Sequence, residues 1–149
     1  MTLKQKIYNH YLQLINNKIK MLQNVLADLK ESCSNETKST AGDKHETALA
    51  MLQIEQANTS SQLNEALSQK AVLEKINPAI CTTIIVNGSL IKTNRGFLFL
   101  SIALGKAVIG HIPVTALSQH SPLGQKLLGL SVKDTAEINQ TKYVIENIL

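Results

Sequence analysis

The sequence has no tryptophan, and aromatic residues of all kinds make up only 3% of its 149 residues. Proteins that bind single-stranded nucleic acid without sequence preference stack the bases on aromatic side chains, so this scarcity argues against such a platform. No apolar run approaches the roughly 18 residues of a membrane span, and the first residues lack the apolar segment of a signal peptide. We therefore expect a cytoplasmic protein without membrane insertion.

Several signatures of self-contained enzymes are also missing. The sequence contains no Gly-rich phosphate loop, no Cys-x-x-Cys pair and no G-x-S-x-G motif. Its two cysteines, Cys33 and Cys81, lie far apart and do not have the spacing of zinc ligands, so we expect both to be reduced thiols. The formal net charge of +4 suits an anionic partner. Nothing here predicts an enzyme that is complete by itself.

Proline and glycine are nearly absent from the first half of the chain. Residues 1–77 contain no proline and only one glycine, Gly42, whereas all three prolines and the other six glycines follow residue 77. Proline breaks helices and glycine weakens them. This contrast predicts two domains, a helical one over residues 1–77 and a second one over residues 78–149.

Apolar residues in the helical domain recur at alternating spacings of four and three, which is the pattern of coiled-coil packing. We expect helices over about residues 2–32 and 43–74, folded back as an antiparallel two-helix coiled coil in a monomer. The alternatives are an ordinary helical domain and a coiled coil between two chains. The first seam comprises Tyr8, Leu12, Ile15, Ile19, Leu22, Leu26, Leu29 and Cys33, and the weaker second seam comprises Leu49, Leu52, Gln56, Thr59, Leu63, Ala66, Lys70 and Leu73.

The second domain has the pattern of short strands. β-Branched runs flank Asn87-Gly88, which predicts a hairpin turn there, and Gly96 suits a bulged turn before the next strand. Ser121 as N-cap, Pro122 in the first turn and Gly129 after the last residue predict a short helix. We expect a compact, mostly-β domain with that one helix, and hence an α+β protein.

Two carboxylates, Asp43 and Glu46, stand where the second helix is expected to begin. A spacing of three places them on one face of a helix. Paired carboxylates suit Mg²⁺, which prefers oxygen ligands, and they also suit general-base chemistry on water. The alternative is that these acids complement the helix dipole, with Asp43 as a cap. His45 between them is expected to be an ordinary solvated residue.

Lysines on the first helix, at positions 4, 6, 18 and 20, could follow a phosphate backbone. A solvated helix face is the commoner reason for such a pattern.

Two segments of the chain resemble the bacterial Gre transcript-cleavage factors. Residues 42–47, "GDKHET", are similar to the family's tip pattern of Gly-Asp, two residues and Glu. Residues 121–138, "SPLGQKLLGLSVKDTAEI", are similar to the family's Ser-Pro-x-Gly-x-x-Leu-x-Gly segment and the strand after it. The order of a helical hairpin and then a small β domain also matches. One departure is Lys133, where the family usually has glycine.

The resemblance implies a function for both domains. The coiled-coil arm, with its acidic tip near residues 36–46, would enter the secondary channel of RNA polymerase. There Asp43 and Glu46 would help hold Mg²⁺ shared with the polymerase and position water, so that the polymerase cleaves the nascent RNA of a backtracked complex. The FKBP-like C-terminal domain, residues 78–149, would dock on the polymerase through the segment of Ser121, Pro122, Leu123 and Gly124.

Two other functions remain open from the sequence. A non-cleaving regulator of the same fold would use the same channel without the acid chemistry, and the presence of Asp43 and Glu46 favours cleavage over this reading. A prolyl isomerase with a helical arm is the other, and the few aromatic residues after residue 77, namely Phe97, Phe99 and Tyr143, argue against its aromatic pocket.

Overall fold

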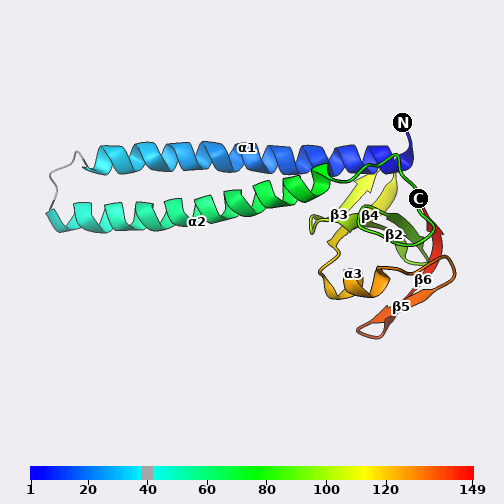
Figure 1. Cartoon of the computed structure of the whole chain (residues 1–149). Helices are drawn as coiled ribbons and strands as arrows, with labels where there is room; N and C mark the ends of the chain where they lie inside the picture. Colours follow the sequence, from blue (N-terminus) through cyan, green and yellow to red (C-terminus); the bar gives the residue numbers. More distant parts are fainter. Residues whose placement is uncertain (38–41) are drawn as a thin grey trace. The chain divides into compact units, whose positions relative to one another are not determined.

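The computed structural model describes the backbone of residues 1–37 and 42–149, and the side chains of residues 1–36 and 46–149. Two long helices, α1 (Leu3–Thr37) and α2 (Gly42–Glu74), precede a six-stranded sheet with a short helix, α3 (Pro122–Leu127) (Figure 1). The predicted α+β order, a helical pair followed by a mostly-β part, is confirmed. Across the described residues, every helix falls short of the length or hydrophobicity that a membrane span requires.

The chain forms two compact units, and both long helices contribute to each of them. Leu14–Lys70 form one, the helical unit, and Met1–Gln13 join Ala71–Leu149 in the other, the sheet unit. The sequence boundary at residues 77 and 78 marks the end of the helical pattern. The compact units divide elsewhere because the first turns of α1 and the last turn of α2 group with residues of the sheet unit.

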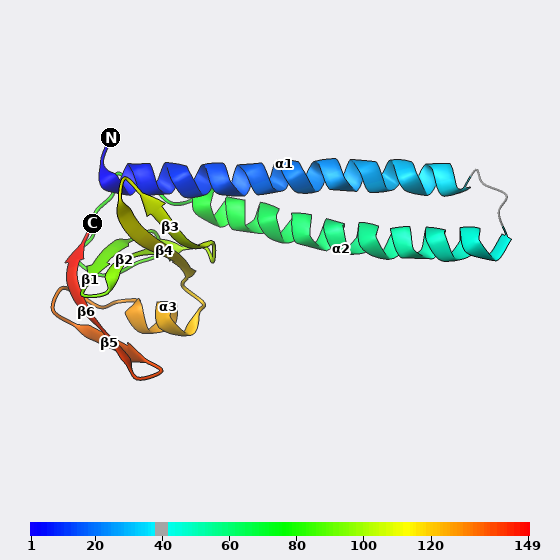
Figure 2. The same ribbon diagram turned by 180° about the vertical axis from the view of Figure 1, so that it is seen from behind.

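The helical unit is an antiparallel pair of helices, as both views of the chain show (Figures 1 and 2). Ile15, Ile19 and Leu22 of the first seam are buried, and the Cys33 thiol lies 3.5 Å from the Gln56 amide oxygen on the facing helix. Every residue of the second seam is buried or half-buried. The second seam is thus confirmed, although it includes polar residues such as Thr59, which is 9% exposed.

The first seam is tightest near its middle, which gives a stability prediction. Leu22 is 5% exposed and Leu26 is only half-buried. Leu22→Ala should lower the free energy of unfolding by about 2–4 kcal/mol, and Leu26→Ala by clearly less, because the cost follows the cavity left behind. Urea unfolding followed by helical circular dichroism measures both. Equal losses would mean that the seam is as closed at Leu26 as at Leu22.

The sheet unit contains one parallel strand pair within an otherwise antiparallel sheet. The strand order is β3-β4-β2-β1-β6-β5, with β2 and β4 parallel and every other neighbouring pair antiparallel. Helix α3 lies in the connection between β4 and β5. The strands are β1 (Leu90–Thr93), β2 (Gly96–Ser101), β3 (Gly105–Ile109), β4 (Ile112–Ser118), β5 (Thr135–Ile138) and β6 (Thr141–Ile148).

The predicted hairpin around Asn87-Gly88 is wrong. Residues 81–86 form no regular strand, and β1 instead pairs with β2 across the turn that ends at Gly96. The first of the two expected strands pairs elsewhere instead. The backbone N–H of Ile85 donates to the carbonyl oxygen of Leu130, a residue that follows α3, at 2.8 Å. Gly88 has a φ of +100° and Gly96 a φ of +109°, so both glycines take the left-handed backbone that their turns require.

The first turns of α1 belong to the core of the sheet unit and correct the start of the first seam. Ile7 and Tyr11 are fully buried, whereas the predicted Tyr8 and Leu12 are only half-buried. The Tyr11 hydroxyl lies 2.9 Å from the Gly105 carbonyl oxygen and 3.3 Å from that of Val114. Burial raises the pKa of this hydroxyl. The face of α1 changes here because the helix packs on strands.

The sheet itself encloses an apolar core. Buried side chains from the strands and α3 form one contiguous cluster, with Leu123, Leu130 and Tyr143 packed against it. The cluster comprises Ile85, Ile91, Leu98, Leu100, Leu117, Leu127, Ala136, Ile145 and Ile148.

Lys133 adopts the conformation that a glycine would take most easily. Its φ is +79°, in the left-handed region, which costs a residue with a side chain about 1–2 kcal/mol. The neighbouring Asp134 carboxylate accepts hydrogen bonds from the Ser131 backbone N–H at 2.8 Å and from its hydroxyl at 3.1 Å. These bonds hold the turn in shape, so the departure from the family pattern at Lys133 leaves the turn in place.

Candidate functional site

The two candidate tip carboxylates lie in the first two turns of α2. Helix α2 begins at Gly42, so Asp43 and Glu46 are three residues apart on regular helix, as the sequence predicts. The Glu46 side chain is exposed. The side chains of Asp43 and His45 lie outside the described residues, so the approach of the two carboxylates and the solvation of His45 stay predictions.

The two tip acids offer oxygen ligands of the kind that suits Mg²⁺. Nowhere in the described part of the chain do three or more His, Cys, Asp or Glu side chains gather as a possible metal site. Mg²⁺ loses its water shell reluctantly and is usually held by one or two carboxylates together with groups from a substrate or partner. Asp43 and Glu46 are of the right type for such a shared site.

The second candidate site, Ser121 to Gly124, has a clear structural role. The Ser121 hydroxyl accepts a hydrogen bond from the Gly124 backbone N–H at 3.0 Å and donates one to the Ser118 carbonyl oxygen at 2.6 Å. Ser121 is the predicted N-cap, and Pro122 follows it in the first turn. A side chain at the buried Gly124 would collide with the Ser118 carbonyl oxygen. Leu123 packs against the core, Gly124 is buried, and Pro122 is the exposed member of the segment.

Pro122 therefore gives a direct test of docking. The resemblance implies docking on RNA polymerase through this segment, so Pro122→Ala is expected to weaken that binding. The melting temperature of the free protein should change little, because Pro122 is exposed. Binding is measured with immobilised polymerase, and stability by thermal unfolding. A lower melting temperature with unchanged affinity would make the segment purely structural.

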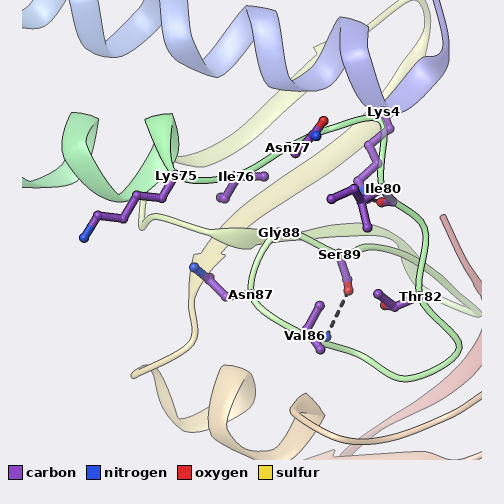
Figure 3. Close-up of a pocket in the computed structure, with 10 residues that line it drawn as sticks. All are labelled: Lys4, Lys75, Ile76, Asn77, Ile80, Thr82, Val86, Asn87, Gly88 and Ser89. Carbon is purple, nitrogen blue, oxygen red and sulfur yellow. Dashed lines mark hydrogen bonds between the residues drawn. The ribbon is translucent and has the colours of Figure 1, made fainter.

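A pocket that sequence reasoning missed lies beside the end of α2 (Figure 3). The sequence placed Lys4 among lysines of a solvated face, but its side chain is only 7% exposed and its ammonium donates to the Ile80 carbonyl oxygen at 2.6 Å. The other three of those lysines are exposed, as expected. The burial of Lys4 could have been inferred from its position three residues before Ile7, which places both side chains on the same face of α1.

Comparison with known proteins finds similarity among solved structures alone. No family model matches the chain, and no curated protein matches it. Among solved structures, the chain is similar to the structure of the transcription factor Gfh1. The TM-score is 0.37, and the sequence identity is 15% over 92% of each chain. This level of similarity assigns neither family nor activity.

Proposed function

We propose that the protein is a transcript-cleavage factor of the Gre type. In this proposal it enters the secondary channel of RNA polymerase and stimulates the polymerase active site to cleave backtracked RNA. The observation that carries the proposal is the position of Asp43 and Glu46, at the start of the second of two antiparallel helices. The resemblance of residues 42–47 and 121–138 to the Gre segments supports it.

The dimensions of the helical unit suit delivery of acid groups through a narrow opening. From Glu46 to Lys70 the helix rises about 36 Å, at about 1.5 Å per residue. Two packed helices are far narrower than a globular domain of the same length of chain. Carboxylates at the turn of such a pair can reach a recessed site that a compact domain cannot enter.

The chemistry of the tip follows from its two acids. Asp43 and Glu46 would offer oxygen ligands to Mg²⁺ and accept hydrogen bonds from water, while the polymerase supplies the remaining ligands. Mg²⁺ in a two-metal site stabilises the attacking and leaving oxygens of a phosphoryl displacement. This chain then contributes orientation and negative charge, and the RNA bond is broken by the polymerase rather than by an active site of this protein.

The sheet unit would hold the protein on the polymerase surface. Support comes from the exposed Pro122 on a rigid, capped turn, since the bonds of Ser121 and the packing of Leu123 fix its position. A rigid turn loses little conformational freedom on binding, which favours affinity. The net charge of +4 suits a complex that contains nucleic acid.

The decisive experiment adds the purified full chain to a stalled, backtracked elongation complex with Mg²⁺. We expect the RNA to be shortened from its 3′ end, and elongation to resume when nucleotides are added. Binding to the polymerase with altered transcription but intact RNA would instead support the non-cleaving regulator. Failure to bind polymerase at all would reject both functions.

A further inference from the structure

The pocket beside the end of α2 is built from three separate segments of the sheet unit. It has a volume of about 230 Å³. Lys4 comes from the start of α1, residues 75–80 from the segment that follows α2, and residues 82–89 from the loop before β1 (Figure 3). The lining residues are Lys4, Lys75, Ile76, Asn77, Ile80, Thr82, Val86, Asn87, Gly88 and Ser89.

The pocket is positively charged and contains a buried cation. Lys4 and Lys75 are among its ten lining residues, and none of the ten carries a carboxylate. Burial of Lys4 lowers the pKa of its ammonium, and Cys81 opposes this effect. A buried charge is normally paired with an opposite charge. Within the described residues, however, the Lys4 ammonium makes one hydrogen bond, to the neutral carbonyl group of Ile80.

A second buried group in the pocket also lacks a partner. The side-chain carbonyl oxygen of Asn87 is buried and makes no hydrogen bond within the described residues. An asparagine amide presents either its oxygen or its NH₂ group, depending on which way it is turned. Turned by half a rotation, Asn87 would present two N–H donors to a ligand at this position.

The other polar groups leave room for such a ligand. The Thr82 hydroxyl donates to the Ile84 carbonyl oxygen at 2.6 Å, and the Ser89 hydroxyl accepts from the Val86 N–H at 3.0 Å. Both hydroxyl groups therefore bond to backbone groups of their own loop, and not to Lys4 or Asn87. In Figure 3 the exposed Lys75 lies on the opposite side of the pocket from Lys4, and its ammonium points outward, away from the other labelled residues. Its flexible stem can bring the ammonium to the mouth of the pocket.

We propose that this pocket binds a small oxyanion of the phosphate type, with Lys4 and Asn87 on the inside and Lys75 at the mouth. A tetrahedral oxyanion has enough acceptor oxygens to bond donors on several sides at once. It would pair the buried ammonium and give the Asn87 amide a partner. The volume accommodates a phosphate group with a small organic substituent, so both free phosphate and a small phosphorylated molecule fit the chemistry.

The test is a titration of the isotope-labelled full chain with inorganic phosphate, followed by ¹H–¹⁵N nuclear magnetic resonance. Sodium chloride of equal ionic strength serves as the reference. We expect saturable shifts confined to residues 4, 75–77 and 82–89. Glycerol phosphate forms a second arm: tighter binding than phosphate identifies a phosphorylated small molecule as the ligand, and equal or weaker binding identifies the free ion.

Variants locate the binding groups. Lys4→Met should weaken phosphate binding about tenfold or more, as loss of a charged hydrogen-bond partner does. Lys75→Gln, at an exposed position that the fold does not need, should weaken it several-fold, so the test holds even if Lys4→Met does not fold. Lys92→Gln, an exposed lysine on β1, is the matched control and should bind like wild type. Shifts that do not saturate, or that persist undiminished in Lys75→Gln and any folded Lys4→Met, would overturn the proposal.

Discussion

Replacing both tip acids, Asp43→Asn together with Glu46→Gln, should reduce stimulated RNA cleavage by about a hundredfold or more, as loss of acid–base and metal-holding groups does. The amides keep the size of the carboxylates but carry no charge and hold Mg²⁺ poorly. Binding to polymerase should stay nearly intact, since the rest of the surface is unchanged. The measurement is the rate of RNA shortening in a backtracked complex at saturating protein.

Two controls separate the metal role from a general effect of charge. Glu55→Gln removes an exposed carboxylate from the same helix, nine residues beyond Glu46, and should leave cleavage unchanged. Residual activity of either single tip variant should rise with Mg²⁺ concentration if the lost role is metal retention. Full cleavage activity of the double variant would sink the cleavage mechanism and favour the non-cleaving regulator.

Phe99→Ala should lower the free energy of unfolding by about 3–5 kcal/mol, the usual cost of emptying a buried aromatic site. Phe99 is fully buried on β2, and its ring centroid lies 6.1 Å from that of Tyr11. The cavity would therefore open between the sheet and the first turns of α1. Since small domains are stable by only about 5–15 kcal/mol, this loss is a large fraction of the total stability.

Phe97 provides the matched control for this loss. It lies two residues earlier on the same strand and is only half-buried, so Phe97→Ala should cost distinctly less. Phe99→Leu should recover much of the stability by refilling part of the space. Denaturant unfolding monitored through the tyrosine signal measures all three variants. Equal losses for Phe97→Ala and Phe99→Ala would contradict the packing described here.

The helical part of the fold was largely predictable because its pattern is local. In the second seam, even polar residues such as Gln56 and Thr59 turned away from solvent, since their spacing places them on the facing side of the helix. The same pattern missed Ile7 and Tyr11, which are more deeply buried than the half-buried Tyr8 and Leu12 that it named. There the partner of α1 is a sheet whose strands lie far along the sequence, and a heptad pattern contains no information about it.

The candidate sites were predictable to different degrees. The N-cap at Ser121 and the short helix after it depend only on residues close in sequence, and the structure contains both as predicted. The hairpin at Asn87-Gly88 failed because Ile85 pairs with Leu130 on the far side of α3. The burial of Lys4 was hidden for a similar reason: its environment is assembled from loops of the second half of the chain.

The hydrogen bonds of Tyr11 link residues that are synthesised at very different times. Its hydroxyl meets carbonyl oxygens 94 and 103 positions later in the chain. At a ribosomal rate of roughly 5–20 residues per second, the first turns of α1 wait roughly 5–20 s before their acceptors exist. During that interval the apolar side chains of Ile7 and Tyr11 are open to chaperones or to other nascent chains. The packing of α1 is thus completed only once β3 and β4 have been made.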